Sequence, residues 1–358
     1  MQPDTSVKKV LIYRLGSLGD TVIALPGFHL IKRVFPAARR VLLSNVPVHA
    51  KAPAAAAVLD GSGLIHGYMH YKVGTRNPAE LLGLAWTIRR FNPDVLVYLA
   101  APRGAGVAER DARFFRFCGI RRVVGLPVGG LAQNRHDPAT GLWETEAARL
   151  LRCVEPLGQC DIDDLTNWDL RLTGAENAKA DEVLAPFAGR PLIVCGPGTK
   201  MQAKDWGQEK WRQLMTRLSA EFPGHALALI GAGDDLAVSG FAAAGWNGPH
   251  VNLCGQLSPR ESAAVIRRGE LFLGPDSGPM HLAAAYGVPC AIAFSAVDRP
   301  GRWFPVGRGH QPIYHTVPCG NCRLTTCVEK KKICIESISV DEMFQAALAA
   351  IHSKENVQ

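Results

Sequence analysis

The sequence predicts an α/β protein built from two doubly wound, Rossmann-like halves. Its 358 residues suit two domains of ordinary size. Short apolar runs alternate along it with amphipathic helical segments, a pattern typical of a parallel sheet that is covered on both faces. The pattern starts afresh after the middle of the chain, so we expect an N-terminal domain over residues 1–180 and a C-terminal domain over residues 181–358.

The N-terminal half begins with its clearest element. A buried strand is predicted over residues 9–13, and a helix over residues 20–34 has apolar side chains that recur on one face. Further strands are expected over residues 41–43 and 94–99. Helices are expected over residues 79–90 and 145–157, and the region between the halves is expected to hold a short polar strand (168–172) and a helix (178–184).

The C-terminal half repeats the alternation. We expect strands over residues 191–195, 225–230, 271–273 and 290–294, with helices over 211–222 and 280–286 and another that begins after Ser258. Ser258 and Glu261 have the spacing of a capping box, and Pro259 stands at the first helical position. The last helix is a candidate to pack back on the N-terminal domain.

The charge balance is basic, since 40 Lys and Arg outnumber 32 Asp and Glu and give a formal charge of +8. Such an excess suits an anionic partner: a nucleotide, a phosphorylated glycan, an anionic membrane surface or nucleic acid. It is densest between residues 103 and 122, which contain Arg103, Arg110, Arg113, Arg116, Arg121 and Arg122. The ordinary interpretation of such a stretch is a solvated helix face.

The sequence has neither the apolar core of a secretory signal nor an apolar run of the roughly 20 residues that span a bilayer. We therefore expect a cytoplasmic protein. Its ten cysteines are then expected to be mostly reduced thiols.

The turn after the first strand is the first candidate site. Gly16 and Gly19 permit a tight turn, and Ser17, Asp20 and Thr21 bring polar groups to the start of a helix. The spacing is neither that of a Walker loop nor that of a dinucleotide fingerprint. From the residues alone, Asp20 is either a helix cap or a catalytic carboxylate.

Two further strand ends carry polar residues. Ser277 and Gly278 directly precede a helix opened by Pro279, and the free N–H groups there suit a diphosphate. The alternative is a capped loop without a ligand, with His281 as an interior histidine. In the loop after the strand at 191–195, Lys204 either neutralises phosphate charge or is an ordinary solvated lysine.

Four cysteines lie close together near the C-terminus. Their spacing can close a tetrahedral structural zinc site. A reduced cysteine-rich loop and a disulfide formed during purification are the alternatives. The four are Cys319, Cys322, Cys327 and Cys334.

Together these segments resemble glycosyltransferase family 9, the ADP-heptose:lipopolysaccharide heptosyltransferase-like enzymes. Residues 252–255, residues 271–285 with their Gly-Pro-Asp-Ser-Gly-Pro-Met-His core, and residues 287–289 are similar to the most characteristic stretch of the family. Residues 14–20 resemble its N-terminal signature, and residues 302–305 and the late cysteines resemble its C-terminal pattern.

The resemblance implies a GT-B fold, in which two Rossmann-like domains face a cleft, and inverting transfer that requires no cofactor or metal. The N-terminal domain would bind the acceptor, with Asp20 as general base and Ser17, Gly19 and Arg103 on the acceptor side. The segment at 100–103 departs from the polar segment usual in the family. The donor site implied by the resemblance comprises Thr199, Lys204, Asp276, Ser277, Gly278 and His281, with Asp235 or its neighbour Asp234 near the ribose.

The function implied is transfer of a sugar, a heptose from ADP-heptose, to a lipopolysaccharide core or related bacterial surface glycan. The expected partners are a nucleotide sugar, a lipid-linked or phosphorylated glycan and the inner membrane surface, contacted peripherally from the cytoplasm. No nucleic acid is expected. The alternatives are a sugar-nucleotide epimerase of GT-B fold, in which a base at Asp20 would have no acceptor to serve, and a zinc- or nucleic-acid-binding protein, which would leave residues 276–281 unexplained.

Overall fold

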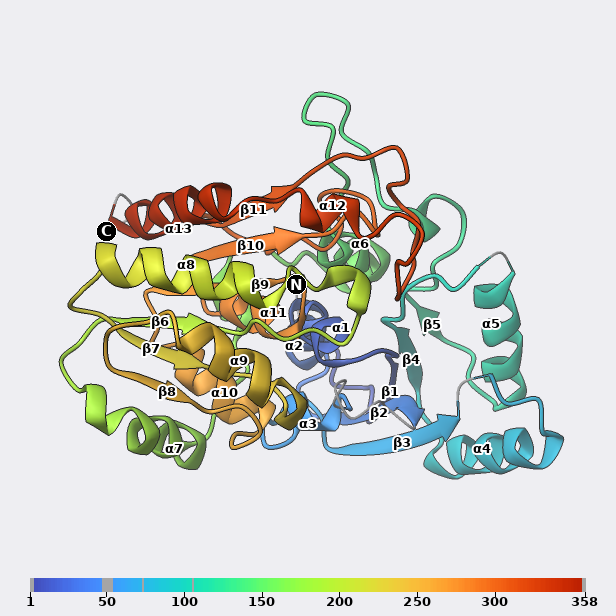
Figure 1. Ribbon diagram of the computed structural model, residues 1–358. Helices are drawn as coiled ribbons and strands as arrows, with labels where there is room; N and C mark the ends of the chain where they lie inside the picture. Colours follow the sequence, from blue (N-terminus) through green and yellow to red (C-terminus); the bar gives the residue numbers. More distant parts are fainter. Residues whose placement is uncertain (1–2, 47–53, 73, 105, 356–358) are drawn as a thin grey trace. The chain divides into compact units, whose positions relative to one another are not determined.

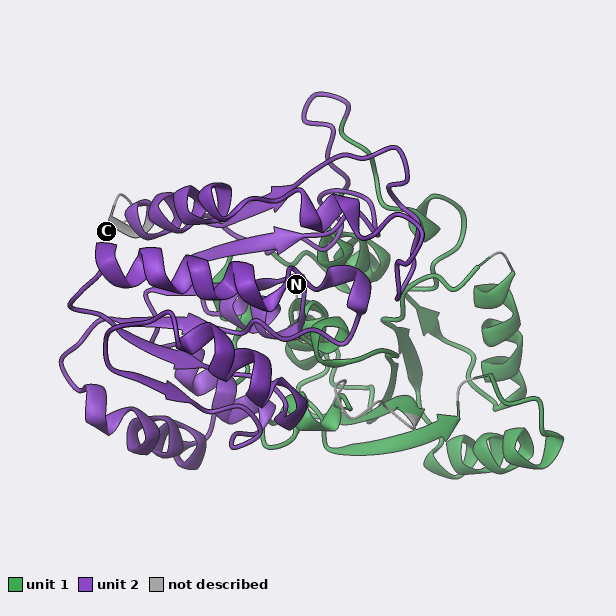
Figure 2. Ribbon diagram, in the orientation of Figure 1, with its two compact units in different colours: residues 1–137, 144–171 green, residues 138–143, 172–358 purple. Residues whose placement is uncertain are grey.

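The structure is a computed structural model that describes residues 3–46, 54–72, 74–104 and 106–355 (Figure 1). The chain forms two compact units (Figure 2). Unit 1 comprises Met1–Asp137 and Glu144–Arg171, and unit 2 comprises Pro138–Trp143 and Leu172–Gln358. The main division therefore falls at residue 171, where the sequence analysis expects it at 180, and a short segment at 138–143 belongs to unit 2.

Unit 1 is built on a parallel sheet of five strands in the order β3-β2-β1-β4-β5. The chain begins in the middle of this sheet, winds to one edge, and then crosses to the other side. The order reverses between β1 and β4, and ligands of open α/β sheets bind at such a reversal. The strands are β1 (Lys9–Tyr13), β2 (Arg39–Val46), β3 (Gly67–Lys72), β4 (Val95–Tyr98) and β5 (Val123–Val124).

The helices of unit 1 are α1 (Leu18–Val22), α2 (Leu25–Val34), α3 (Ala56–Leu59), α4 (Pro78–Phe91), α5 (Val107–Phe117) and α6 (Glu146–Val154), with 3-10 turns η1 (Gly129–Ala132), η2 (Glu155–Leu157) and η3 (Leu165–Trp168). The prediction of a single helix over 20–34 is wrong, because the helical structure is interrupted between α1 and α2. Pro26 lies in the first turn of α2, where its missing N–H costs nothing. The strand predicted over 168–172 is also wrong, since η3 ends there; Asp164 Oδ1 accepts the Thr166 N–H at its start.

Unit 2 is built on a parallel sheet of six strands in the order β11-β10-β9-β6-β7-β8. Its winding repeats that of unit 1, and the order reverses between β6 and β9. This is the doubly wound arrangement that the sequence predicts. The strands are β6 (Leu192–Cys195), β7 (Ala226–Leu229), β8 (His250–Asn252), β9 (Leu271–Pro275), β10 (Cys290–Phe294) and β11 (Gln311–Tyr314).

The helices of unit 2 are α7 (Gly174–Leu184), α8 (Gln208–Glu221), α9 (Leu236–Ala243), α10 (Pro259–Ile266), α11 (Gly278–Ala285), α12 (Ile333–Glu336) and α13 (Val340–Glu355), with 3-10 turns η4 (Ala185–Phe187), η5 (Gln202–Lys204) and η6 (Gly233–Asp235). The capping box predicted at α10 is confirmed, because Ser258 and Glu261 exchange backbone-to-side-chain hydrogen bonds of 2.7 and 3.2 Å. The last helix, α13, packs on α8, β9, β10 and β11 of its own unit. Its packing on the N-terminal domain stays a prediction.

Each unit has its own apolar core beneath the loops that matter for function. In unit 2 the indoles of Trp206 and Trp211 are fully buried, with ring centroids 4.7 Å apart. The Trp206 indole N–H donates to the Ile338 carbonyl over 2.9 Å, which anchors the chain just after η5. Within the described part of the chain, no helix combines the length and apolar character needed to cross a bilayer.

Candidate active site

The polar residues singled out from the sequence gather at the strand-order reversals of the two sheets. In unit 1 they follow β1 and β4, and in unit 2 they follow β6, β7 and β9. Because parallel strands end at the same edge, each reversal brings together loops that are distant in the sequence. The turns that hold Asp20, Lys204 and Ser277 were predicted from strand ends, whereas Arg103 and Asp235 were predicted from the family resemblance.

Asp20 lies at the third residue of α1, and Ser17 precedes the helix as its N-cap. Asp20 Oδ2 accepts the backbone N–H of Ser17 over 2.8 Å and its hydroxyl over 3.0 Å. Its other oxygen, Oδ1, lies 3.7 Å from Nη2 of Arg14, and 29% of the side chain is exposed. The interpretation of Asp20 as the N-cap itself is therefore wrong in position, although the carboxylate does contribute to capping. It is also partly open to solvent, as a proton acceptor must be.

Arg14, the residue after β1, fixes the turn that carries Asp20. Its guanidinium is fully buried, and Nη1 donates to the Leu99 carbonyl over 2.6 Å while Nη2 donates to the Asp20 carbonyl. Burial lowers the pKa of Arg14, and the nearby carboxylate of Asp20 opposes that shift. No role for Arg14 was predicted from the sequence. The feature of the sequence that could have identified it is a charged residue directly after an apolar strand.

Gly16 lets the Asp20 carboxylate lie against the turn. Its backbone has φ +120°, and a Cβ there would stand 2.3 Å from Cγ of Asp20. The Gly16 N–H also donates to Oδ1 of Asn45 over 3.0 Å. The position of Asp20 therefore depends on the absence of a side chain at residue 16.

We expect Gly16→Ala to destabilise unit 1 and to displace Asp20. The left-handed backbone alone costs an alanine about 1–3 kcal/mol, and the contact with Asp20 adds to this. Gly104→Ala is the matched control, because Gly104 has φ +122° but the nearest atom to its Cβ position is 4.0 Å away. Thermal unfolding and turnover of both variants test the prediction. Equal losses in the two variants would mean that the contact with Asp20 contributes nothing.

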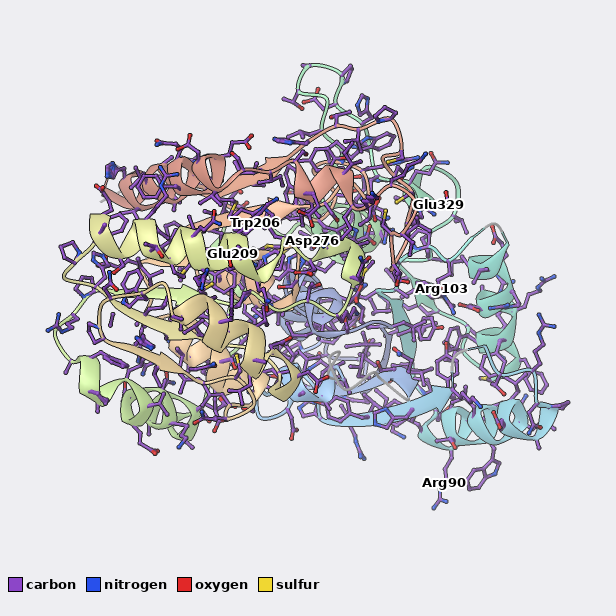
Figure 3. The ribbon with its side chains drawn as sticks, viewed as in Figure 1. Arg90, Arg103, Trp206, Glu209, Asp276 and Glu329 are labelled. Atoms are coloured by element: carbon purple, nitrogen blue, oxygen red, sulfur yellow. The ribbon has the colours of Figure 1, made fainter. Side chains whose placement is uncertain are left out.

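Arg103 follows β4 and is held by other side chains of unit 1 (Figure 3). Its Nη2 donates to the Tyr13 hydroxyl over 2.9 Å and to Oδ2 of Asp111. The Tyr98 hydroxyl donates to the same Asp111 oxygen over 2.9 Å. Burial raises the pKa of Tyr13 and of Tyr98, so both stay neutral phenols beside the Arg103–Asp111 ion pair. Arg103 is thus an exposed residue that precedes α5 and does not lie on a helix face, and its guanidinium is paired with Asp111.

An ion pair joins two loops of unit 2. Lys204, at the end of η5, places Nζ 2.5 Å from Oδ2 of Asp276, which follows β9. The two side chains are only 16% and 7% exposed. Lys204 is therefore no ordinary solvated lysine, and its ammonium group is fixed at the reversal point of the sheet.

Two buried hydroxyls lie beside this pair of loops. Ser277 occupies the N-cap position of α11, but its side chain makes no capping hydrogen bond. Its Oγ is buried and has no hydrogen-bond partner among the described residues. Ser295, which is 3% exposed, has an Oγ in the same condition within the described chain. Pro275 pairs with Ala293 across β9 and β10, so each serine lies two residues beyond a paired position. Buried hydroxyls are normally satisfied, so these two favour a ligand with oxygen atoms at this edge. Ser295 was not predicted from the sequence as a site residue.

Asp235 and Thr199 lie at the neighbouring strand ends. Asp235, which is 8% exposed, accepts the Ala232 N–H over 2.9 Å. A Cβ on Gly198 would stand 2.2 Å from its Cγ, so the loops after β6 and β7 touch at Asp235. The Thr199 hydroxyl accepts the Met201 N–H over 3.3 Å. This bond lies at the start of residues 199–204, which end in η5 and are called the Lys204 turn below.

His281 is buried in α11, with 6% of its surface exposed. Its ring lies edge-on to that of Trp303, with centroids 6.3 Å apart. The Trp303 indole N–H donates to Oδ2 of Asp298 over 2.8 Å. The histidine is thus an interior residue of the same edge of the sheet, and its contact with a donor stays a prediction.

The cysteine-rich segment contacts the Lys204 turn. The Ala203 N–H donates to the Thr325 carbonyl over 3.1 Å, and the Cys327 N–H donates to Oε1 of Gln202 over 2.9 Å. All ten cysteines are free thiols, among them Cys319, Cys322, Cys327 and Cys334. In the part of the chain that is described, no three His, Cys, Asp or Glu side chains are grouped as a metal ion requires. The structural zinc stays a prediction, which elemental analysis of the purified protein tests.

Two curated proteins are similar to this chain in sequence. A lipopolysaccharide heptosyltransferase 3 of Escherichia coli K12 is 25% identical over 291 residues, 78% of this chain and 80% of that protein. A second E. coli protein of that name is 33% identical over 113 residues, which span 31% of this chain and only a third (33%) of the relative.

Solved structures agree over nearly the whole chain. A glycosyl transferase family 9 protein of Veillonella parvula has a TM-score of 0.69 at 17% identity, covering 98% of this chain and 99% of its own. The ADP-heptose lps heptosyltransferase II of E. coli has a TM-score of 0.65 at 17% identity, covering 97% and 99%. These likenesses establish the GT-B type of fold with its two Rossmann-like units.

The family model described as "Glycosyltransferase family 9 (heptosyltransferase)" matches residues 132–333, more than half of the chain. The match includes Lys204, the first turn of α11 and three of the four clustered cysteines, Cys319, Cys322 and Cys327. On this evidence, the chain belongs to glycosyltransferase family 9.

Proposed function

We propose that this glycosyltransferase moves a heptose, with inversion, from ADP-heptose to a lipopolysaccharide core or a related bacterial surface glycan. The donor and the acceptor class are those named for the relatives, a lipopolysaccharide heptosyltransferase 3 and an ADP-heptose lps heptosyltransferase II. The observation that carries the proposal is the Lys204–Asp276 ion pair beside the first turn of α11, with the unpartnered Ser277 hydroxyl next to it.

The donor half of the reaction is assigned to unit 2. When the acceptor oxygen bonds to the anomeric carbon, the bond to the diphosphate breaks and the leaving nucleoside diphosphate gains negative charge. Lys204, the N–H groups of α11 and the Ser277 hydroxyl are positioned to stabilise that charge. A lysine ammonium has three donors, so Asp276 can orient Lys204 and still leave donors for phosphate. In this proposal no divalent cation is required.

The acceptor half is assigned to unit 1. Asp20 takes the proton from the attacking hydroxyl, and Arg103 binds a phosphate group of the glycan. Ser17 and Gly19 form the turn that holds the base. We place the reaction at the cytoplasmic side of the inner membrane, where a lipid-linked acceptor would be met peripherally.

We expect ADP to raise the melting temperature in the presence of EDTA, because a ligand that binds only the folded state stabilises it by about 2.7 kcal/mol at a hundredfold excess over Kd. Transfer from ADP-heptose should also survive EDTA. The measurement is a thermal-shift series with ADP, GDP and UDP, with and without Mg²⁺, alongside detection of heptose on the acceptor.

Each element of the proposal has its own contrary result. Loss of both binding and transfer in EDTA would refute the metal-free mechanism. Stronger stabilisation by GDP or UDP would refute the assignment of the nucleotide. Isomerised donor without sugar on any acceptor would identify an epimerase.

A further inference from the structure

One surface of unit 1 combines large apolar side chains with arginines. Leu82 and Trp86 of α4 are 59% and 61% exposed, and Phe117, the last residue of α5, is 51% exposed. Arg89, Arg90 and Arg113 are also exposed. We call these six residues the α4–α5 face.

Contacts between the two helices make this a continuous surface. Leu82, Trp86 and Arg90 follow one another at four-residue spacing and so lie along one side of α4. The Arg90 guanidinium lies 5.4 Å from the centre of the Trp86 ring, and Arg90 extends away from the ribbon in Figure 3. Arg89 lies 4.8 Å from the Phe117 ring and donates Nε–H to the Phe117 carbonyl over 3.1 Å.

The charge of this region is strongly one-sided. Residues 78–122 contain eight arginines but only four carboxylates, Glu80, Asp94, Glu109 and Asp111. Asp111 is already paired with Arg103 and Arg110. No ion pair joins Arg89, Arg90 or Arg113 to a carboxylate within the described ranges. The apolar side chains are therefore surrounded by uncompensated positive charge.

We propose that the α4–α5 face docks on an anionic lipid surface. Tryptophan prefers the boundary between head groups and acyl chains, and arginines beside it would meet the negative charge of the lipid heads. A symmetric dimer is the less suitable occupant, because it would set this patch against itself and oppose arginine to arginine. The inference rests on the proposed function in one respect: docking would bring unit 1 to the surface that holds a lipid-linked acceptor.

The test is sedimentation of the full-length protein with vesicles of phosphatidylethanolamine and phosphatidylglycerol, compared with phosphatidylcholine vesicles. We expect the anionic vesicles to bind at least about tenfold more protein, and added salt to weaken the binding. Leu82→Ser with Trp86→Ser, and Arg90→Gln with Arg113→Gln, should each reduce binding about tenfold or more. Leu165→Ser is the control, since Leu165 is 48% exposed elsewhere in unit 1.

Melting temperature and turnover of a water-soluble acceptor fragment should be unchanged in all these variants. If the parent protein turned over that fragment but did not bind anionic vesicles, the docking proposal would be wrong and the proposed function would stand. If the parent protein bound anionic vesicles but did not turn over the fragment, the proposed function would be wrong and the docking proposal would stand. Ultracentrifugation of the Leu82→Ser, Trp86→Ser double variant tests the other occupant. If these substitutions dissociated an oligomer and left vesicle binding unchanged, the α4–α5 face would be an interface between copies of the chain and the proposal would be wrong.

Discussion

Asp20→Asn is expected to lower turnover about 10²–10⁴-fold, the usual contribution of a general base, with an almost unchanged melting temperature. The amide oxygen of asparagine can still accept the Ser17 N–H that Oδ2 of Asp20 accepts over 2.8 Å. It cannot accept the proton of an acceptor hydroxyl. ADP binding should also be unchanged, because the donor residues belong to unit 2. Turnover, melting temperature and ADP titration of one purified variant make the measurement.

Glu261→Gln is the matched control for this experiment. Glu261 plays the same capping part in α10 that Asp20 plays in α1, since each carboxylate accepts the N–H of the N-cap serine. We expect the control to keep parental turnover. If Asp20→Asn also turned over within a few-fold of the parent, Asp20 would be a capping residue and the base would have to be sought elsewhere.

The central strands of both sheets could be predicted from the sequence because they are buried on both faces. Strands such as β1, β6 and β10 are continuous apolar runs, and all but the first residue of β1 are buried. None of the edge strands was predicted: β5 and β8 are only two and three residues long, and β3 and β11 lack a continuous apolar run. The side chains of β3 and β11 are polar or mixed and largely half-exposed, so only pairing with a neighbour holds them in place. Pairing with a neighbouring strand leaves no pattern in the strand's own amino-acid sequence.

The candidate site shows a similar division. The positions of Asp20, Lys204, Asp276 and Ser277 follow from strand ends, which the sequence reveals. Their partners do not, because a contact such as Lys204–Asp276 spans 72 positions and depends on β6 lying beside β9. No role for Arg14 was predicted for a related reason: its burial depends on the carbonyls of Leu99, just after β4, and of Asp20 in α1, which are distant from each other in the sequence.

Lys204→Ala is expected to weaken ADP binding about 10–100-fold, since charge-assisted hydrogen bonds contribute about 1.5–3 kcal/mol. It should also lower the free energy of unfolding by about 1–3 kcal/mol, because it leaves the buried Asp276 carboxylate without its cation. Asp276 is only 7% exposed, so water cannot readily replace the missing cation. Lys210→Ala is the control, because Lys210 pairs with Glu336 of the same unit.

Adding Asp276→Asn separates the two effects of Lys204→Ala. The double variant no longer buries an unpaired carboxylate, so its unfolding free energy should recover most of the loss. Its ADP affinity should stay low, because the cation that meets the phosphates is still absent. Calorimetric unfolding and ADP titration of both single variants and the double variant complete the cycle. Recovery of ADP affinity together with stability would mean that Lys204 acts only by neutralising Asp276, and the diphosphate would then depend on the first turn of α11 and the Ser277 hydroxyl.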